Sequence, residues 1–92
     1  MTQHVHDNVE KSRFELTVGG VTAFSEYSRR DGVVVFIHTE VPEALGGKGV
    51  GTALARGALD MVRARGERIV IRCPFIAAFV HKHPEYQDLV IH

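Results

Sequence analysis

Apolar and polar residues alternate along two neighbouring segments near the start of the chain. In residues 13–18, RFELTV, every second side chain is apolar, which is the period of a half-buried strand. The Gly19-Gly20 pair that follows is typical of a two-residue hairpin turn, and Val21–Ser28 continues as a second strand. The predicted hairpin pairs side chains that match in character, opposite charges included: Val18 with Val21, Leu16 with Ala23, and Arg13 with Glu26.

A third segment, residues 33–41 with the sequence VVVFIHTEV, opens with five apolar residues in succession. It follows an Asp-Gly turn signal at residues 29–32. An unbroken apolar run of this length predicts a central strand that is covered on both faces. Pro42 should end the strand, because proline has no N–H to donate to a neighbouring strand.

The next apolar residues recur with the period of an amphipathic helix that packs on a sheet. They follow a glycine cluster at residues 46–51 and are Val50, Ala53, Leu54, Gly57, Ala58, Met61 and Val62. Gly57 lies inside the apolar stripe, where it would allow close approach of the helix to the strands. Gly66 follows two arginines and is typical of a helix C-terminus.

The last third of the chain predicts a short strand at Arg68–Cys73, a helix at Pro74–His83 with proline in its first turn, and a tail. Residues 1–12 are polar, and we expect a flexible N-terminal segment there. The order β-β-β-α-β-α places a right-handed parallel crossover after an antiparallel hairpin. The predicted fold class is α+β, a mixed, mostly antiparallel sheet of about four strands with two packed helices, in one domain over residues 1–92.

Composition narrows the function classes. The chain has 92 residues, and its formal net charge is zero, which argues against nucleic acid or an acidic membrane surface as a partner. With a single cysteine, Cys73, no intrachain disulfide can form, and a reducing cytoplasmic location is the expectation. We find neither a signal-peptide pattern nor an apolar run near the ~20 residues of a membrane helix.

The glycine cluster at the start of the predicted helix is suited to binding an anion such as phosphate. The first N–H groups of a helix have no intrahelical partner, and glycines let several of them converge on a phosphate. A tight turn that needs positive φ explains the same glycines equally well. Two phosphate motifs do not fit: GGKGVGTA lacks the GK[ST] ending of a P-loop, and no acid lies at the dinucleotide-fold spacing.

The segment TEVPEALGGKGVGTALARGALD resembles the coenzyme A pyrophosphate loop of the GNAT superfamily of N-acetyltransferases, whose pattern is [QR]-x-x-G-x-[GA]. Gly49 and Gly51 match its last positions, and Gly46 stands where Gln or Arg is usual. A longer and more specific similarity, CPFIAAFVHKHPEYQDLV, is to a small single-domain GNAT-like group and extends the resemblance over nearly the whole chain.

The resemblance implies that acetyl-CoA binds at this loop. The strand before the loop would splay at a bulge, and the backbone of Thr39 and Val41 would contact the pantetheine arm. The pyrophosphate would be held by the loop and the first helical turn, that is by Gly46, Gly47, Lys48, Gly49, Val50, Gly51 and Thr52. Lys48 could equally be a solvent-exposed loop residue, and Thr52 a plain first-turn residue.

The catalytic residues stay open between two candidates. The family's usual acid is a Tyr in the last helix, and because Phe79-Val80 stands in its place, Tyr86 is a substitute whose other role is to cap the core. Cys73 ends a strand beside the expected thioester and precedes a helix, which favours a thiolate; it is either an acyl carrier or a buried inert thiol. His38 or Glu40 could act as a base, although both fit a solvent-facing role.

Metal binding is not expected, because His81 and His83 are two residues apart on a helix and face different ways.

The resemblance implies an acetyltransferase that acts on an unidentified amine, with a protein as one conceivable acceptor. The alternatives are a coenzyme A-binding module without turnover and an interaction domain that has lost the ligand. The acyl chain and the oligomeric state are not set by the sequence.

Overall fold

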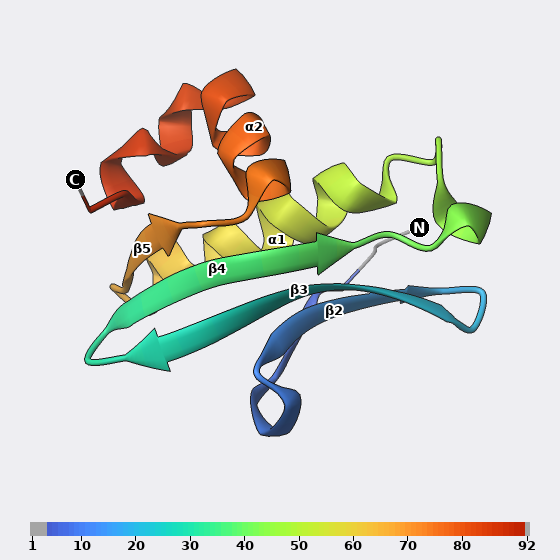
Figure 1. Ribbon diagram of the computed structural model, residues 1–92, viewed down its shortest axis with the longest axis horizontal. Helices are drawn as coiled ribbons and strands as arrows, with labels where there is room; N and C mark the ends of the chain where they lie inside the picture. Colours follow the sequence, from blue (N-terminus) through green and yellow to red (C-terminus); the bar gives the residue numbers. More distant parts are fainter. Residues whose placement is uncertain (1–3, 92) are drawn as a thin grey trace.

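A five-stranded sheet with strand order β1-β2-β3-β4-β5 forms the base of the structure, a computed structural model that describes residues 4–91 (Figure 1). The first four strands pair antiparallel, and β4 and β5 pair parallel. The strands are β1 (His6–Asn8), β2 (Arg13–Val18), β3 (Val21–Arg30), β4 (Val33–Glu40) and β5 (Arg68–Ile71). The helices are α1 (Val50–Ala64) and α2 (Pro74–Lys82), with short 3-10 turns η1 (Val9–Lys11), η2 (Glu43–Leu45) and η3 (Pro84–Leu89). The predicted α+β class is confirmed, with one strand more than expected.

The β2–β3 hairpin has the predicted register. Val18 lies opposite Val21 and Leu16 opposite Ala23, and both turn glycines have positive φ, 58° and 80°. Arg13 lies opposite Glu26 as predicted, but its side chain pairs instead with Glu15 at 2.5 Å. The register therefore follows from the alternation and the turn rather than from that charge pair.

Residues 6–11, which we expected to be flexible, form β1 and η1 instead. The β1 strand pairs with β2, and its central residue, Asp7, is buried. The Tyr27 hydroxyl and the Arg65 guanidinium both donate to the Asp7 carboxylate. This strand has no apolar alternation, so its tertiary contacts, and not its local pattern, hold it on the sheet.

Within residues 4–91 only one face of the sheet is covered by helices (Figure 1), which corrects the expectation for the apolar run of β4. Val34 and Phe36 are fully buried, whereas Ile37 is 43% exposed and Val33 and Val35 are only partly buried. Both helices contribute to a single core cluster on the covered face, and α1 contacts α2 as well as β2, β3 and β5 (Figure 1). The second face has no helix of the described chain against it.

The helices begin where the sequence predicts. The α1 helix starts at Val50, and Pro74 occupies the first turn of α2. Gly57 does allow a close approach, but to the Val5 side chain rather than to the central strands. The chain beyond α2 packs back on α1 through η3, and an isolated parallel bridge joins Val90 to Ile69 at the edge of β5. None of the helices in the described part of the chain has the length and hydrophobicity of a membrane span.

Candidate functional site

A bulge in β4 changes the direction of its last side chains. Phe36 lies opposite Tyr27 and His38 lies opposite Glu26, so Ile37 is an extra residue on β4. An extra residue shifts the alternation of a strand by one position. Thr39 consequently returns to the covered face, beside Ser25.

Beyond the bulge, β4 and β5 separate. Their parallel pairing stops at Phe36 and Ile71, and one more hydrogen bond follows, from the Arg72 N–H to the Phe36 carbonyl at 2.9 Å. The chain after β5 then turns at Cys73 into α2. Along residues 37–41 the edge of β4 that faces α2 therefore has no partner strand in residues 4–91. An unpaired strand edge of this kind can pair with an extended ligand.

Three polar side chains meet under the separated strands, of which Ser25 and Cys73 are buried and Thr39 is partly buried. The Thr39 hydroxyl lies 2.9 Å from Ser25 Oγ and 3.2 Å from Cys73 Sγ. Cys73 is 1% exposed and is the residue directly before the first turn of α2. The three side chains satisfy one another's hydrogen bonds, and the thiol lies at the point where the strands part.

The glycine loop presents unpaired N–H groups. After η2, Gly47 and Gly49 take positive φ values of 75° and 73°, which side chains with a Cβ rarely adopt. The first backbone hydrogen bond of α1 is donated by Ala53 to the Gly49 carbonyl at 3.0 Å. No backbone carbonyl of residues 4–91 accepts a hydrogen bond from the N–H groups of residues 47–52. Such groups, at the positive end of a helix, are suited to an anion.

Gly51 has a different role from the other loop glycines. A Cβ at this position would lie 2.7 Å from the Phe75 ring and 3.3 Å from the Val41 side chain. Gly51 thus lets the first turn of α2 and the end of β4 pack directly against the start of α1. Phe75 nevertheless stays 39% exposed, so part of its ring is available to a ligand.

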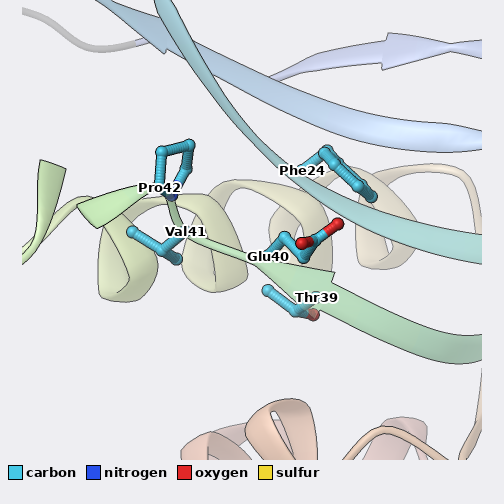
Figure 2. A pocket seen from close by; sticks show the side chains of 5 residues that line it. All are labelled: Phe24, Thr39, Glu40, Val41 and Pro42. Atoms are coloured by element: carbon cyan, nitrogen blue, oxygen red, sulfur yellow. The ribbon is translucent and has the colours of Figure 1, made fainter. Parts of the chain in front are cut away.

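Three hollows in the surface lie along the end of β4, the glycine loop and α2. The strand-end hollow, seen in Figure 2, is lined by Phe24, Thr39, Glu40, Val41 and Pro42. The loop hollow runs from Val41 along the glycines to Thr52 and Phe75. The helix hollow is lined by Thr52, Phe75, Ala78, Phe79, Lys82 and His83.

The three hollows lie next to one another, because neighbours share lining residues. Val41 lines both the strand-end and the loop hollow, and Thr52 and Phe75 line both the loop and the helix hollow. Their volumes of 460, 230 and 120 Å³ suit an elongated ligand better than a compact one. Figure 2 shows Glu40 and Phe24 on one side of the strand end and Thr39 on the other.

The two predicted catalytic side chains lie in different surroundings. Cys73 contacts Thr39 at the strand end, as described above. Tyr86 is a buried residue of η3, and its hydroxyl donates to Asp60 at 2.6 Å and accepts from Arg56 at 3.3 Å. Burial, together with the hydrogen bond to Asp60, raises the pKa of Tyr86. The two side chains make no hydrogen bond to each other.

The other sequence candidates are exposed. Lys48 and Thr52 both lie at the surface of the loop and first turn. His38 and Glu40 are 3.7 Å apart and point away from the Thr39 side of the strand. No group of three or more His, Cys, Asp or Glu side chains within residues 4–91 is arranged to hold a metal ion.

Sequence reasoning missed Ser25, Phe24, Phe75 and Lys82 as members of this site. Phe75 carried a signal: the core positions of α2 are Ile76, Phe79 and Val80, and position 75 lies off that stripe. Ser25 and Phe24 had no such signal in the sequence, because the bulge on the neighbouring strand β4 brings them into the site.

Comparisons with known proteins agree with this geometry. A family model described as GCN5-related N-acetyl-transferase matches residues 13–89. Protein NATD1 from Bos taurus is 40% identical over 57 residues, and Protein NATD1 from Danio rerio 37% over 57 residues. The two matches cover 62% and 60% of this chain, which spans about half the length of these relatives, 50% and 52%. The solution structure of a GCN5-like protein from Staphylococcus aureus superposes with a TM-score of 0.71 at 24% identity, covering 96% of this chain and 87% of that one, which shows a shared fold.

Proposed function

The chain belongs to the GCN5-related N-acetyltransferase family, and we propose that it binds acetyl-CoA and transfers the acetyl group to an amine. The observation that carries this proposal is the row of neighbouring hollows from the strand end along the glycine loop to α2. Acetyl-CoA is an elongated molecule with a thioester at one end and a pyrophosphate near the other. The Cys73 thiol lies 3.2 Å from Thr39, which lines the strand-end hollow, and the loop hollow has N–H groups without a backbone acceptor, so these residues fit the ligand.

The pantetheine arm would lie along the free edge of β4. Its amide groups can pair with the backbone of Thr39 and Val41 in the manner of an added strand. The pyrophosphate would then sit in the loop hollow, against the N–H groups from Gly47 to Thr52, with the Lys48 ammonium close by.

Cys73 would act as the acyl carrier. Its thiolate attacks the carbonyl carbon of the acetyl thioester, the bond from that carbon to the coenzyme A sulfur breaks, and the departing thiolate takes up the proton that Cys73 gave up. A neutral amine then attacks the new thioester on Cys73, the carbon–sulfur bond breaks, and the amine proton returns to the thiolate. The Thr39 hydroxyl, 3.2 Å from Sγ, can donate to the thiolate and accept from the thiol. Tyr86 as an acid for the leaving thiolate is the alternative.

The proposal is tested by calorimetric titration of the chain with acetyl-CoA, with Gly49→Val as the comparison. The variant places a Cβ-branched residue at a φ of 73° and should lose binding. Circular dichroism must show that it is folded. Saturable binding by the wild type that the folded variant has lost supports the pyrophosphate site. A folded wild type that gives no binding contradicts the proposal and favours an interaction domain.

A coenzyme A-binding module without turnover is the second candidate. It is favoured by the position of Tyr86, whose hydroxyl is engaged by Asp60 and Arg56 on α1 rather than directed to the strand end. Mass spectrometry after incubation with acetyl-CoA separates the two. An acetyl group on Cys73 that an added primary amine removes supports the transferase, whereas tight binding without acetylation of protein or amine supports the module.

A further inference from the structure

Ser25 is a buried polar residue of β3 whose side chain has one hydrogen-bond partner. It is 0% exposed, and within residues 4–91 its hydroxyl bonds only to the Thr39 hydroxyl, at 2.9 Å. The other buried polar residue of this part of the chain is Asp7, which a tyrosine and an arginine from distant elements hold in place. Ser25 has no such network, and through Thr39 it leads to the Cys73 thiol.

Burial sets the direction of the hydrogen bond between the two hydroxyl groups. A buried O–H group needs an acceptor, and the Thr39 oxygen is the one that residues 4–91 offer to the Ser25 proton. The opposite direction would leave the Ser25 proton buried without a partner, which is costly. Ser25 therefore donates to Thr39.

The Thr39 proton is then directed to the Cys73 sulfur, 3.2 Å away. Neither of the two hydrogen bonds uses the thiol proton, so both persist when the thiol ionises. The bond from Thr39 to sulfur becomes stronger at that point, because its acceptor is then charged. A hydroxyl that accepts one hydrogen bond is also a stronger donor of the next. The chain from Ser25 through Thr39 to Cys73 therefore favours the thiolate.

Charged side chains of residues 4–91 form no hydrogen bond or ion pair with these three residues. On β4, His38 and Glu40 pair with each other on the other side of the strand, and Arg72 after β5 is exposed. The charged side chains of α1 bond to η3, and those of α2 lie in its last turn, away from Cys73. The two hydroxyl groups are thus the polar side chains that contact the thiolate or its donor.

We propose that Ser25 is a positioning residue for Cys73, which directs the Thr39 proton to the sulfur and so stabilises the attacking thiolate. This inference rests on the proposed function, in which Cys73 is the acyl carrier. Ser25 does not contact the reacting atoms and acts through Thr39 alone. The bulge in β4 makes this possible, because it turns Thr39 toward Ser25 on the neighbouring strand.

The ultraviolet absorbance of the thiolate, measured against pH, tests the inference without any ligand. The chain has one cysteine, so the signal that remains after subtraction of the Cys73→Ala curve belongs to Cys73. Ser25→Ala should raise the half-point of this titration by about half a pH unit, which lowers the thiolate population roughly threefold below the half-point. Ser28→Ala is the matched control: it changes an exposed serine of the same strand and should leave the half-point unchanged.

Two further measurements separate positioning from packing. In a Thr39→Val background, Ser25→Ala should cause no additional shift, because the link to the sulfur is already gone. Coenzyme A release from acetyl-CoA should slow about threefold in Ser25→Ala at neutral pH, and the deficit should narrow as the pH rises and both thiols ionise.

An unchanged half-point in a folded Ser25→Ala variant would overturn the inference, as would an equal shift in the Thr39→Val background. The expected shift together with slower release supports it. The expected shift in a chain whose wild type releases no coenzyme A would contradict the proposed function, while it supports the role of Ser25 in setting the state of the thiol.

Discussion

The two ends of β4 differ in how completely their polar groups are paired. At the end where β4 begins, beside the start of β5 and the end of α1, Arg29 bonds Glu67 at 2.8 Å and lies 3.2 Å from Asp7. Asp7 also accepts from Tyr27 and from Arg65, at 2.5 and 2.6 Å. Burial alone would raise the pKa of Asp7, but the hydrogen bonds from Tyr27 and Arg65 and the charge of Arg29 together lower it. We call this group of five side chains the closed cluster.

At the other end of β4, several polar groups have no partner within residues 4–91. After Phe36 the edge of β4 that faces α2 has no partner strand in the described chain. The N–H groups of the glycine loop have no backbone acceptor there, and Lys48 and Lys82 have no acidic partner. Folding costs conformational entropy that only satisfied groups and buried apolar area offset. The polar groups that lack a protein partner at one end of β4, whose other end is paired, are the groups to which the proposed ligand would bind.

Asp7→Ala should have the largest effect and should act on stability alone. The variant removes the carboxylate that pairs with Arg29 and Arg65, so both arginines lose a charged partner. Because Arg65 is partly exposed, we expect a loss of about 3 kcal/mol in the free energy of unfolding. Urea denaturation measures it. Glu40→Ala at the other end removes an exposed carboxylate and should cost less than about 0.5 kcal/mol. Similar losses for the two variants would contradict the difference between the ends.

Cys73→Ala should act mainly on chemistry. Without the thiol, the rate of coenzyme A release from acetyl-CoA should fall about a hundredfold, while the dissociation constant of acetyl-CoA stays within about twofold. A thiol reagent follows the released coenzyme A. Tyr86→Phe is the matched control, because it removes the hydroxyl of the other candidate catalytic residue. A Cys73→Ala variant with unchanged release, or a loss confined to Tyr86→Phe, would disprove the cysteine mechanism.

High pH should destabilise the folded protein through the closed cluster. Burial and the neighbouring Asp7 raise the pKa of Tyr27 from 10.0 to about 12. The folded state keeps the phenol proton longer than the unfolded state, so the stability it contributes is complete below pH 10 and is lost as the pH rises toward 12. We expect a loss of about 2 kcal/mol over that interval, measured by urea denaturation.

Two tyrosine variants check that assignment. Tyr27→Phe should be less stable at neutral pH and should show a flatter dependence above pH 10, because it has no phenol to ionise. Tyr86→Phe should keep most of the slope that comes from Tyr27. A slope unchanged by Tyr27→Phe would mean that another group titrates there.

Where local patterning decides the structure, the sequence was sufficient. The β2–β3 register, the start of α1 and the proline in the first turn of α2 follow from alternation, turn residues and helix capping. The β1 strand did not, because it is held by Asp7 through side chains that are 20 and 58 residues away along the chain. Local propensity carries no information about such contacts.

Some features of the candidate site also follow from the local sequence, and others depend on tertiary packing. Unpaired N–H groups in the glycine loop could be expected from its glycines and the helix that follows, and the bulge in β4 was expected only through the family resemblance. Phe75 and Lys82 could not be placed, because their position depends on how α2 packs against Gly51. Ser25 is buried and polar without a sequence signal, and its partner Thr39 reaches it only because Ile37 shifts the alternation.

Thr39→Val should have the smallest effect, and it separates positioning from packing. The variant keeps the shape of the side chain but removes the hydroxyl that contacts Cys73 and Ser25, so coenzyme A release should slow about fivefold, close to 1 kcal/mol in the barrier. It also leaves Ser25 buried without its partner, which should cost about 1 kcal/mol of stability. Thr39→Ser retains the hydroxyl and should restore the release rate even if it packs less well. If Thr39→Ser is as slow as Thr39→Val, the hydroxyl does not position the thiol, and Thr39 contributes to the site through its packing and its backbone alone.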